Sequence, residues 1–430
     1  MPKAKKKSKL GGQLRPKQDQ GFGSEEESIA DNSSVVSNLS ELRLDSDDDT
    51  LVEAEEEFIT THDFEDKFKE AMEGLLQKSA KSRVDSLEVI RKSLSSKFMN
   101  IFIEERWFSL CDSIERSLKR GKGEEQVKGA VVAALLCIQL GSLEVGELAY
   151  SHLKLLLLTL LQDPMAQPSV RSQCATSLGL CCFIVNSNKE ELQSIMESLY
   201  NVFRASLLKG NGALPNHRPE ISALHSCALL SWNLLLTLLS PQHAISLADT
   251  HINKIPQLLE STDVDLRIAA GETLAIFHEI ARQYYMNFEF EDQNILCEKL
   301  QSLATDSQKF RAKKDRRQQR SSFRDILRTI EDRESLDIRV RLDQETLYIE
   351  NWCHKRQYDA LCQVLGSGMK LHLQQNELLR EIFELGEPLI DDQTIVKSSK
   401  LQRRSAHMAA DKARTKCMSK LRDKRADVGC

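Results

Sequence analysis

The stretches "SVRSQCATSLGL" at residues 169–180 and "DLRIAAGETLAI" at residues 265–276 share one frame, and this frame decides the fold. In each stretch an apolar residue precedes an arginine, Arg171 or Arg267. A pair of small residues follows three and four positions after the arginine, and a leucine stands seven positions after it. Apolar residues at these spacings fall on one face of a helix, and small residues allow a second helix to come close. The frame therefore predicts closely packed amphipathic helices.

The same frame recurs along the chain. Weaker copies are "SRVDSLEVI" at Arg83, "QVKGAVVAAL" at Lys128 and "EISALHSCAL" near Ser222. From Arg83 to Arg267 the successive spacings are 45, 43, 51 and 45 residues. Such a period is typical of HEAT and armadillo units, which hold two or three helices each. We therefore predict an all-α, HEAT/armadillo-like helical-repeat solenoid in which the arginine bonds carbonyls or acids of the adjoining unit. The alternative is a set of unrelated helices in which the pattern coincides.

The composition changes along the 430 residues and divides the chain into segments. Residues 1–62 hold a basic head and then an acidic, Ser-rich stretch, which predicts a disordered arm. Helical periodicity covers residues 63–308, which we assign to the repeats. A sixth copy of the frame is due near residue 312, where a strongly basic sequence stands instead. We therefore predict that residues 309–335 form a basic capping helix that ends the solenoid.

The C-terminal part contains two further segments. We predict a helical domain over residues 336–396, in which the alternation at 336–350 indicates a short extended segment and Gly-Ser-Gly at 366–368 breaks the helix. Its large apolar residues are expected to pack on the end of the array: Trp352, Tyr358, Leu361, Leu365, Leu373, Leu379 and Phe383. Residues 397–430 are predicted to form a basic tail helix, frayed in solution and ordered when phosphates neutralise its lysines.

Basic charge is concentrated in two segments of a chain whose formal net charge is −5. Residues 309–328 carry nine Lys or Arg against two acids, and residues 397–430 carry eleven against three. In the first segment arginines recur at every fourth position, from Arg316 to Arg328, as one face of a helix. We expect Phe323, Leu327 and Ile330 to face the body, while five cations project to solvent: Lys313, Arg316, Arg317, Arg320 and Arg324.

The natural counter-ion for such segments is nucleic-acid phosphate, bound through release of counterions. The tail has no aromatic residue, so stacking on bases is not expected to dominate. This favours recognition of the backbone of a shaped RNA, and the alternative is a solvated charged surface. The RNA-binding candidates in the internal segment are Lys313, Arg316, Arg317, Arg320 and Arg324, and those in the tail are Lys412, Arg414, Lys416, Lys420, Arg422, Lys424 and Arg425.

Catalytic and cofactor motifs are missing from the sequence. It contains no phosphate-binding Gly-rich loop, nucleophile elbow, HExxH string or defensible pair of carboxylates. Cys353, His354, Cys362 and His372 follow one another at spacings that fit no familiar zinc site. The eleven cysteines form no C-x-x-C, which indicates free thiols in a reducing compartment, and no apolar run is long enough to span a membrane. We expect a binding protein without enzymatic activity, cofactor, metal, membrane or small-molecule substrate.

Seven strings between residues 65 and 428 resemble the interferon-related developmental regulator family. They are, in order, "KSAKSR", "LCIQLG", "RIAAGE", "LATDSQKFRAKKDRRQQRSSFRD", "VLGSGM", "LLREIFELG" and "KARTKCMSKLRDKRADV". The resemblance implies a helical-repeat regulator of gene expression. Family members are linked to translationally inactive ribosomes, in which a C-terminal helix occupies the channel used by mRNA and tRNA. They are also described as nuclear transcriptional co-regulators that join histone-deacetylase complexes.

By this resemblance the tail from about Lys397 corresponds to the ribosome-inserted element, and its anionic partner is ribosomal RNA. The expected function is ribosome binding with repression of translation, in the cytoplasm and the nucleus. The rival function is a nuclear scaffold whose concave solenoid face binds co-repressor proteins. One departure affects the placement of the tail: "SSKLQRRSAHMAADK" at residues 398–412 lacks the aromatic residue that family members tend to carry before the basic tail.

Overall fold

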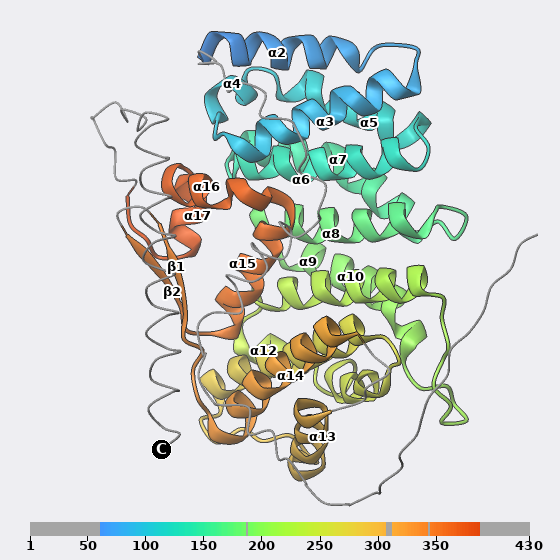
Figure 1. Cartoon of the computed structure of the whole chain (residues 1–430), viewed down its shortest axis with the longest axis vertical. Helices are drawn as coiled ribbons and strands as arrows, with labels where there is room; N and C mark the ends of the chain where they lie inside the picture. The colour runs from blue at the N-terminus through green and yellow to red at the C-terminus, as the bar shows by residue number, and fades with distance from the viewer. Residues whose placement is uncertain (1–60, 186–187, 307–311, 343–344, 388–430) are drawn as a thin grey trace, which may run out of the picture.

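The computed structural model describes residues 61–185, 188–306, 312–342 and 345–387. These residues are helical apart from one two-stranded hairpin and the connecting loops. The predicted all-α helical-repeat solenoid is confirmed, and its helices stack along the long axis of the molecule (Figure 1). The segments before residue 61 and after residue 387, for which we predicted a disordered arm and a basic tail helix, lie outside the described residues.

The helices form two rows. The inner row, in which each helix contacts the next, consists of α3 (Ala80–Ser96), α6 (Glu124–Leu140), α8 (Pro168–Val185), α10 (Pro219–Leu236), α12 (Val264–Tyr284) and α14 (Lys313–Leu327). The outer row consists of α2 (Thr61–Gly74), α5 (Trp107–Arg120), α7 (Glu144–Gln162), α9 (Lys189–Phe203), α11 (Pro241–Ser246) with η2 (Ile252–Glu260), and α13 (Gln293–Thr305). The short helices α4 (Asn100–Glu104) and η1 (Arg204–Ser206) lie in the connections. Each outer element packs on the inner helix that follows it, so one unit is a helical hairpin.

The copies of the sequence frame begin the first five helices of the inner row. Arg83, Arg171, Ser222 and Arg267 are each the fourth residue of their helix, and Lys128 is the fifth residue of α6. The frame therefore marks one unit of the solenoid, and the predicted repeat is confirmed.

The repeat arginine satisfies the end of the preceding helix. The last carbonyls of a helix have no partner within it. Arg171 Nε donates to the carbonyl of Leu161 at the end of α7 (2.9 Å), and Arg267 donates to the carbonyl of Ser261 just after η2 (2.6 Å). Arg267 also donates to Gln319 of α14 and so joins two units. Both arginines lie near helix starts as predicted. The predicted contact with an adjoining unit is confirmed for Arg267, whereas the hydrogen bond from Arg171 stays within its own unit.

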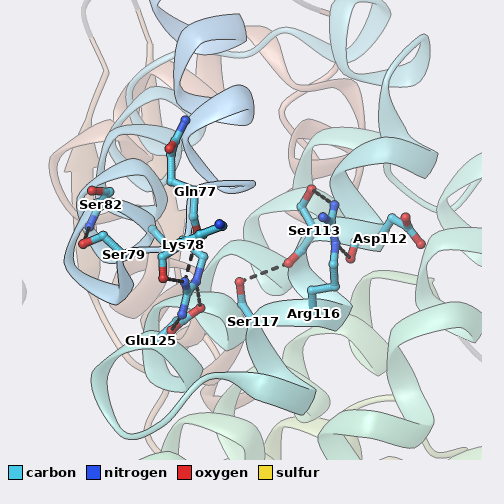
Figure 2. A network of polar contacts seen from close by, with 10 residues as sticks. Gln77, Lys78, Ser79, Ser82, Asp112, Ser113, Arg116, Ser117 and Glu125 are labelled. Atoms are coloured by element: carbon cyan, nitrogen blue, oxygen red, sulfur yellow. Dashed lines mark hydrogen bonds and ion pairs between the residues drawn. The ribbon is translucent and has the colours of Figure 1, made fainter.

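Arg83 combines both contacts at the first unit. Its guanidinium donates to the carbonyls of Gln77 (3.0 Å) and Lys78 (2.8 Å), and it forms a bidentate pair with Glu125 of α6 (2.7 and 2.8 Å). These three partners lie close together in Figure 2. The hydrogen bond to Glu125 raises the pKa of Arg83. One side chain therefore caps its own unit and fixes the next.

Small residues set the spacing between inner helices. Cys174, Ala175 and Ala270 are fully buried, as the frame predicts. A Cβ atom on Gly271 would lie 2.8 Å from both Phe323 and Ile326 of α14, which is closer than a side chain tolerates. The seam between α12 and α14 therefore requires the small residue that the sequence provides.

The C-terminal part begins with an antiparallel hairpin of β1 (Ile338–Arg341) and β2 (Thr346–Ile349), which confirms the predicted extended segment. It continues through α15 (Trp352–Leu365), the turn η4 (Gly366–Gly368), α16 (Met369–Gln375) and α17 (Glu377–Ile382). The predicted helix break therefore falls at η4.

The expectation that these C-terminal helices pack on the end of the array is wrong. Their large apolar residues are buried, but against the inner row: α15 contacts α12, α10, α6 and α3, and α16 contacts α3 (Figure 1). His372 Nε2 lies 3.1 Å from the carbonyl of Leu94, and Asn376 donates to the carbonyl of Ile138 (3.0 Å). A Cβ on Gly368 would lie 1.6 Å from the carbonyl oxygen of Ser95, so only glycine permits this approach. The C-terminal helices α15 and α16 therefore lie along the inner row, and they do not cover the side of α14 that faces away from α12.

Candidate nucleic-acid interface at the end of the solenoid

Helix α14 is the last member of the inner row in the described residues (Figure 1). Arg316 is its fourth residue, as Arg267 is in α12, and Phe323 stands seven positions later in the place of the frame's leucine. The basic segment is therefore the sixth copy of the repeat, although it is far more basic than the other copies. The sequence analysis did not identify this copy. The spacing of 49 residues from Arg267 to Arg316 falls within the range of the other spacings and could have indicated it.

The buried side of α14 holds the helix to the solenoid. Phe323, Ile326 and Ile330 are fully buried, and Leu327 is nearly so, which confirms the predicted inward face. Gln319 is buried beside them and donates to the carbonyl of Leu303 (3.2 Å) while it accepts from the repeat arginine of α12. A helix with so many cations is poor alone, so this packing is what stabilises it.

The predicted solvent-facing cations separate into two groups. Lys313, Arg317 and Arg324 are exposed as expected, whereas Arg316 and Arg320 are half-buried and the Nε of Arg316 is enclosed. Residues four apart drift by about 40° around a helix, so a ladder of fourth positions cannot stay on one side. The prediction that all five project to solvent is wrong for Arg316 and Arg320.

A different spacing describes the exposed surface better. Positions i, i+4, i+7 and i+11 stay within about 60° of one another around a helix and form a nearly straight line. On α14 these positions are basic, and we call them the end stripe: Lys313, Arg317, Arg320 and Arg324. The stripe is about 16 Å long at 1.5 Å per residue.

The corresponding positions on α12 seat the next helix, and we call them the seam stripe: Val264, Ile268, Gly271 and Ala275. Ile268, Gly271 and Ala275 are buried, and Gly271 meets α14 directly. The end stripe therefore occupies the face on which a further repeat would pack, with small and apolar residues replaced by cations.

The cations of α14 have no carboxylate partner within the described residues. No ion pair there involves Lys313, Arg317, Arg320 or Arg324. Asp325, an acid of the same helix, is half-buried, and burial raises the pKa of its carboxyl. The end stripe is thus a line of positive charge available to an external anion.

The comparisons with known proteins agree with the motifs. A family profile described as Interferon-related developmental regulator matches residues 32–331, and one described as Interferon-related protein conserved region matches residues 376–426. Interferon-related developmental regulator 1 of Homo sapiens is 44% identical over 373 residues, which cover 86% of this chain and 83% of that protein. The chain belongs to the interferon-related developmental regulator family. Interferon-related developmental regulator 2 of Mus musculus is 42% identical over 379 residues, or 87% of this chain and 86% of that protein.

The candidate residues fall inside both family regions. Helix α14 lies in the first, and the tail candidates from Lys412 to Arg425 lie in the second, outside the described residues. Among solved structures, an engineered protein aligns with a TM-score of 0.38 and 16% identity over 61% of this chain and 97% of that chain. A TM-score this low does not establish a shared fold.

The described residues contain one group of three potential metal ligands within 4.8 Å of one another, Asp112, Glu115 and His152 on α5 and α7. Glu115 already pairs with Lys119, and its Oε2 lies 2.8 Å from His152 Nε2. The hydrogen bond from Lys119 lowers the pKa of Glu115. These pairings account for the cluster without an ion.

The sequence quartet of cysteines and histidines is not brought together by the fold. No three of Cys353, His354, Cys362 and His372 place ligand atoms within 4.8 Å of one another in the described residues. Burial raises the pKa of the Cys362 thiol to about 12, which disfavours the thiolate that a metal needs. None of the helices in the described residues combines the length and the apolar composition that are needed to cross a membrane.

A polar cavity of about 190 Å³ lies where α12, the π-helical turn η3 (Arg328–Asp332) and the start of α15 meet. Glu279 inside it accepts from the backbone N–H of Trp352 (2.8 Å) and so caps α15. Burial lowers the pKa of neighbouring His278 to about 4. Acids and arginines both line the cavity, so its charge favours no particular ligand.

Proposed function

We propose that this protein binds ribosomes and represses translation by occupying functional RNA sites. The end stripe would hold ribosomal RNA phosphates, and the basic tail after residue 397 would enter the RNA channels. The observation that carries the proposal is the end stripe itself, because cations with no ion pair among the described residues stand where α12 carries small and apolar residues. Membership of a regulator family supports the same direction. We propose both a cytoplasmic and a nuclear location.

The rival function is a nuclear scaffold that holds transcriptional co-repressors. In its simplest form a partner would lie along the inner row. Helices α15 and α16 of the same chain already cover that row, which removes the surface the rival needs there. The rival therefore requires another surface.

The test is sedimentation of the full chain through a sucrose gradient. Co-migration with 80S particles that weakens as salt rises supports ribosome binding, because phosphate contacts release counterions. A variant with K313E, R317E and R324E should bind more weakly with a flatter salt dependence. A matched control carries K81E, R120E and K122E, since these cations are exposed, lie away from α14 and form no ion pair in the described residues.

The tail is tested in a cell-free translation extract. Deleting residues 400–430 should abolish repression while leaving the melting temperature of the solenoid nearly unchanged. Equal repression by the truncated and intact chains would remove the tail as the blocking element. Exclusively nuclear protein with no 80S co-migration would favour the scaffold.

A further inference from the structure

We propose that the end stripe binds one phosphodiester strand through its phosphates, with no reading of bases other than guanine and no preference for RNA over DNA. This inference rests on the proposed function and names the chemical class that the site recognises. It follows from the arrangement of the cations, from what is absent among them, and from the face on which they stand.

The exposed cations of α14 follow one row, apart from Lys314, which stands about 60° around the helix from Arg317. The four members of the end stripe follow one line along α14, with steps of about 6, 4.5 and 6 Å from the helical rise. Successive phosphates of one extended strand lie at comparable separations. A groove binder instead contacts the two backbones that border the groove, and this requires cations on both flanks of the reading element. A single row therefore fits one strand better than a duplex.

Arginine and lysine can bond the O6 and N7 atoms of guanine, but reading any other base requires groups that the stripe lacks. Exposed aromatic side chains provide stacking, but the one aromatic residue of α14, Phe323, is fully buried. Asn and Gln side chains read base edges, yet Gln319 is buried and bonded within the solenoid. Gln318 is exposed, but it stands about 100° or more around the helix from every member of the stripe. The uncharged polar residues Ser321 and Ser322 are half-buried. A strand without guanine is therefore held through its phosphates alone.

Discrimination between RNA and DNA requires contact with the ribose 2′-hydroxyl. Lysine and arginine only donate hydrogen bonds, and a phosphate oxygen competes for them with a full negative charge. Any preference of the whole protein for RNA must then come from another segment. This separates the work of the end stripe from that of the tail.

The experiment measures the contribution of the stripe alone. Fluorescence anisotropy gives the Kd of the full chain and of the K313Q/R317Q/R324Q variant for 12-mers of uridine, of thymidine and of abasic deoxyribose phosphate, and for a 12-base-pair RNA duplex. The three substituted side chains are exposed, and equal melting temperatures verify the fold. The quantity compared is the ratio of variant to wild-type Kd on each probe. The K81Q/R120Q/K122Q chain is the control.

We expect the variant to lose about tenfold or more in affinity for each single strand at 50 mM salt, and its salt slope to fall by about two for the three charges removed. The three single-strand ratios should agree within about twofold, and the duplex ratio should be smaller. A uridine ratio ten times the abasic ratio would show base reading and overturn the proposal, as would a larger ratio on the duplex.

Failure of this inference differs from failure of the proposed function. If the chain sediments with 80S particles but the Kd ratio is one on every probe, the stripe is not a strand site although ribosome binding stands. If the ratios behave as expected and no 80S association occurs, the stripe binds strands and the ribosomal role is wrong.

Discussion

The seam stripe of α12 and the end stripe of α14 occupy the same positions on two successive copies of one repeat. On α12 these positions are buried or half-buried and hold Val264, Ile268, Gly271 and Ala275. On α14 they hold one lysine and three arginines that are exposed or half-buried. The backbone geometry is shared, so the difference lies in the side chains alone. The exchange of small and apolar residues for cations makes this face of α14 unsuitable for a further repeat, since a row of charges cannot be buried against another helix.

We expect the largest effect on stability when an arginine, as found in the end stripe, replaces a residue of the seam stripe. Ala275 is fully buried, and arginine there would place an unpaired charge and a long side chain between helices. We expect A275R to cost more than about 4 kcal/mol of unfolding free energy, from burial of charge together with overpacking. Urea denaturation monitored by circular dichroism measures it. A cost below about 1 kcal/mol would mean that this position does not face a packed seam.

The covered inner row should lose stability in acid. Burial lowers the pKa of His372 to about 4 from an ordinary value of 6.5. Between about pH 6.5 and pH 4, His372 is therefore protonated in the unfolded chain but not in the folded chain. The unfolding free energy falls as the pH drops through this range and then levels off. The loss from this residue is at most about 3 kcal/mol.

The measurement is the unfolding free energy as a function of pH for the native chain and for H372Q. His225 and His278 also have pKa values lowered to about 4 by burial, so the acid loss should shrink in H372Q without vanishing. Identical pH profiles for the two chains would show that His372 is not buried against α3.

A moderate effect is expected from enlarging a small residue without adding charge. Ala270 is fully buried in α12 beside Gly271, which meets α14. We expect A270L to overpack this region and cost about 1–3 kcal/mol. Thermal denaturation is sufficient to detect it. The result also helps to interpret A275R. The loss of unfolding free energy in A275R beyond that in A270L measures the cost of the buried charge, as distinct from the cost of added volume.

Much of the fold was predictable because the residues that determine the packing of each repeat lie close together in the sequence. The arginine, the small pair and the leucine recur at fixed positions, and each requirement is met within one helix and its neighbour. The direction of the C-terminal helices was not predictable in this way. The apolar residues of α15 and α16 show that one face is buried but not against what, and the bond between His372 and Leu94 joins residues 278 positions apart.

The composition of the sequence predicted which helix carries the candidate site, but the prediction of which side chains are exposed was partly wrong. The density of cations in residues 309–328 identified α14. The ladder of fourth positions, however, includes Arg316, whose Nε is enclosed, because a period of four departs from the 3.6 residues of a helical turn. The exposed line includes Arg317 instead, and only the register of α14 against α12 decides between the two arginines.

The smallest effect belongs to the reverse exchange, R324A, at the position equivalent to Ala275. Arg324 is exposed and forms no ion pair in the described part of the chain, so its truncation leaves no buried group unsatisfied. Alanine also has the higher helix propensity. We expect the unfolding free energy of R324A to match the native value within about 0.5 kcal/mol. Differential scanning calorimetry of R324A beside A275R provides the matched pair, since both exchange the same two residue types at one repeat position. A loss above about 2 kcal/mol in R324A would mean that the arginine supports the fold, and the end stripe would then be a structural cap instead of a surface reserved for an anion.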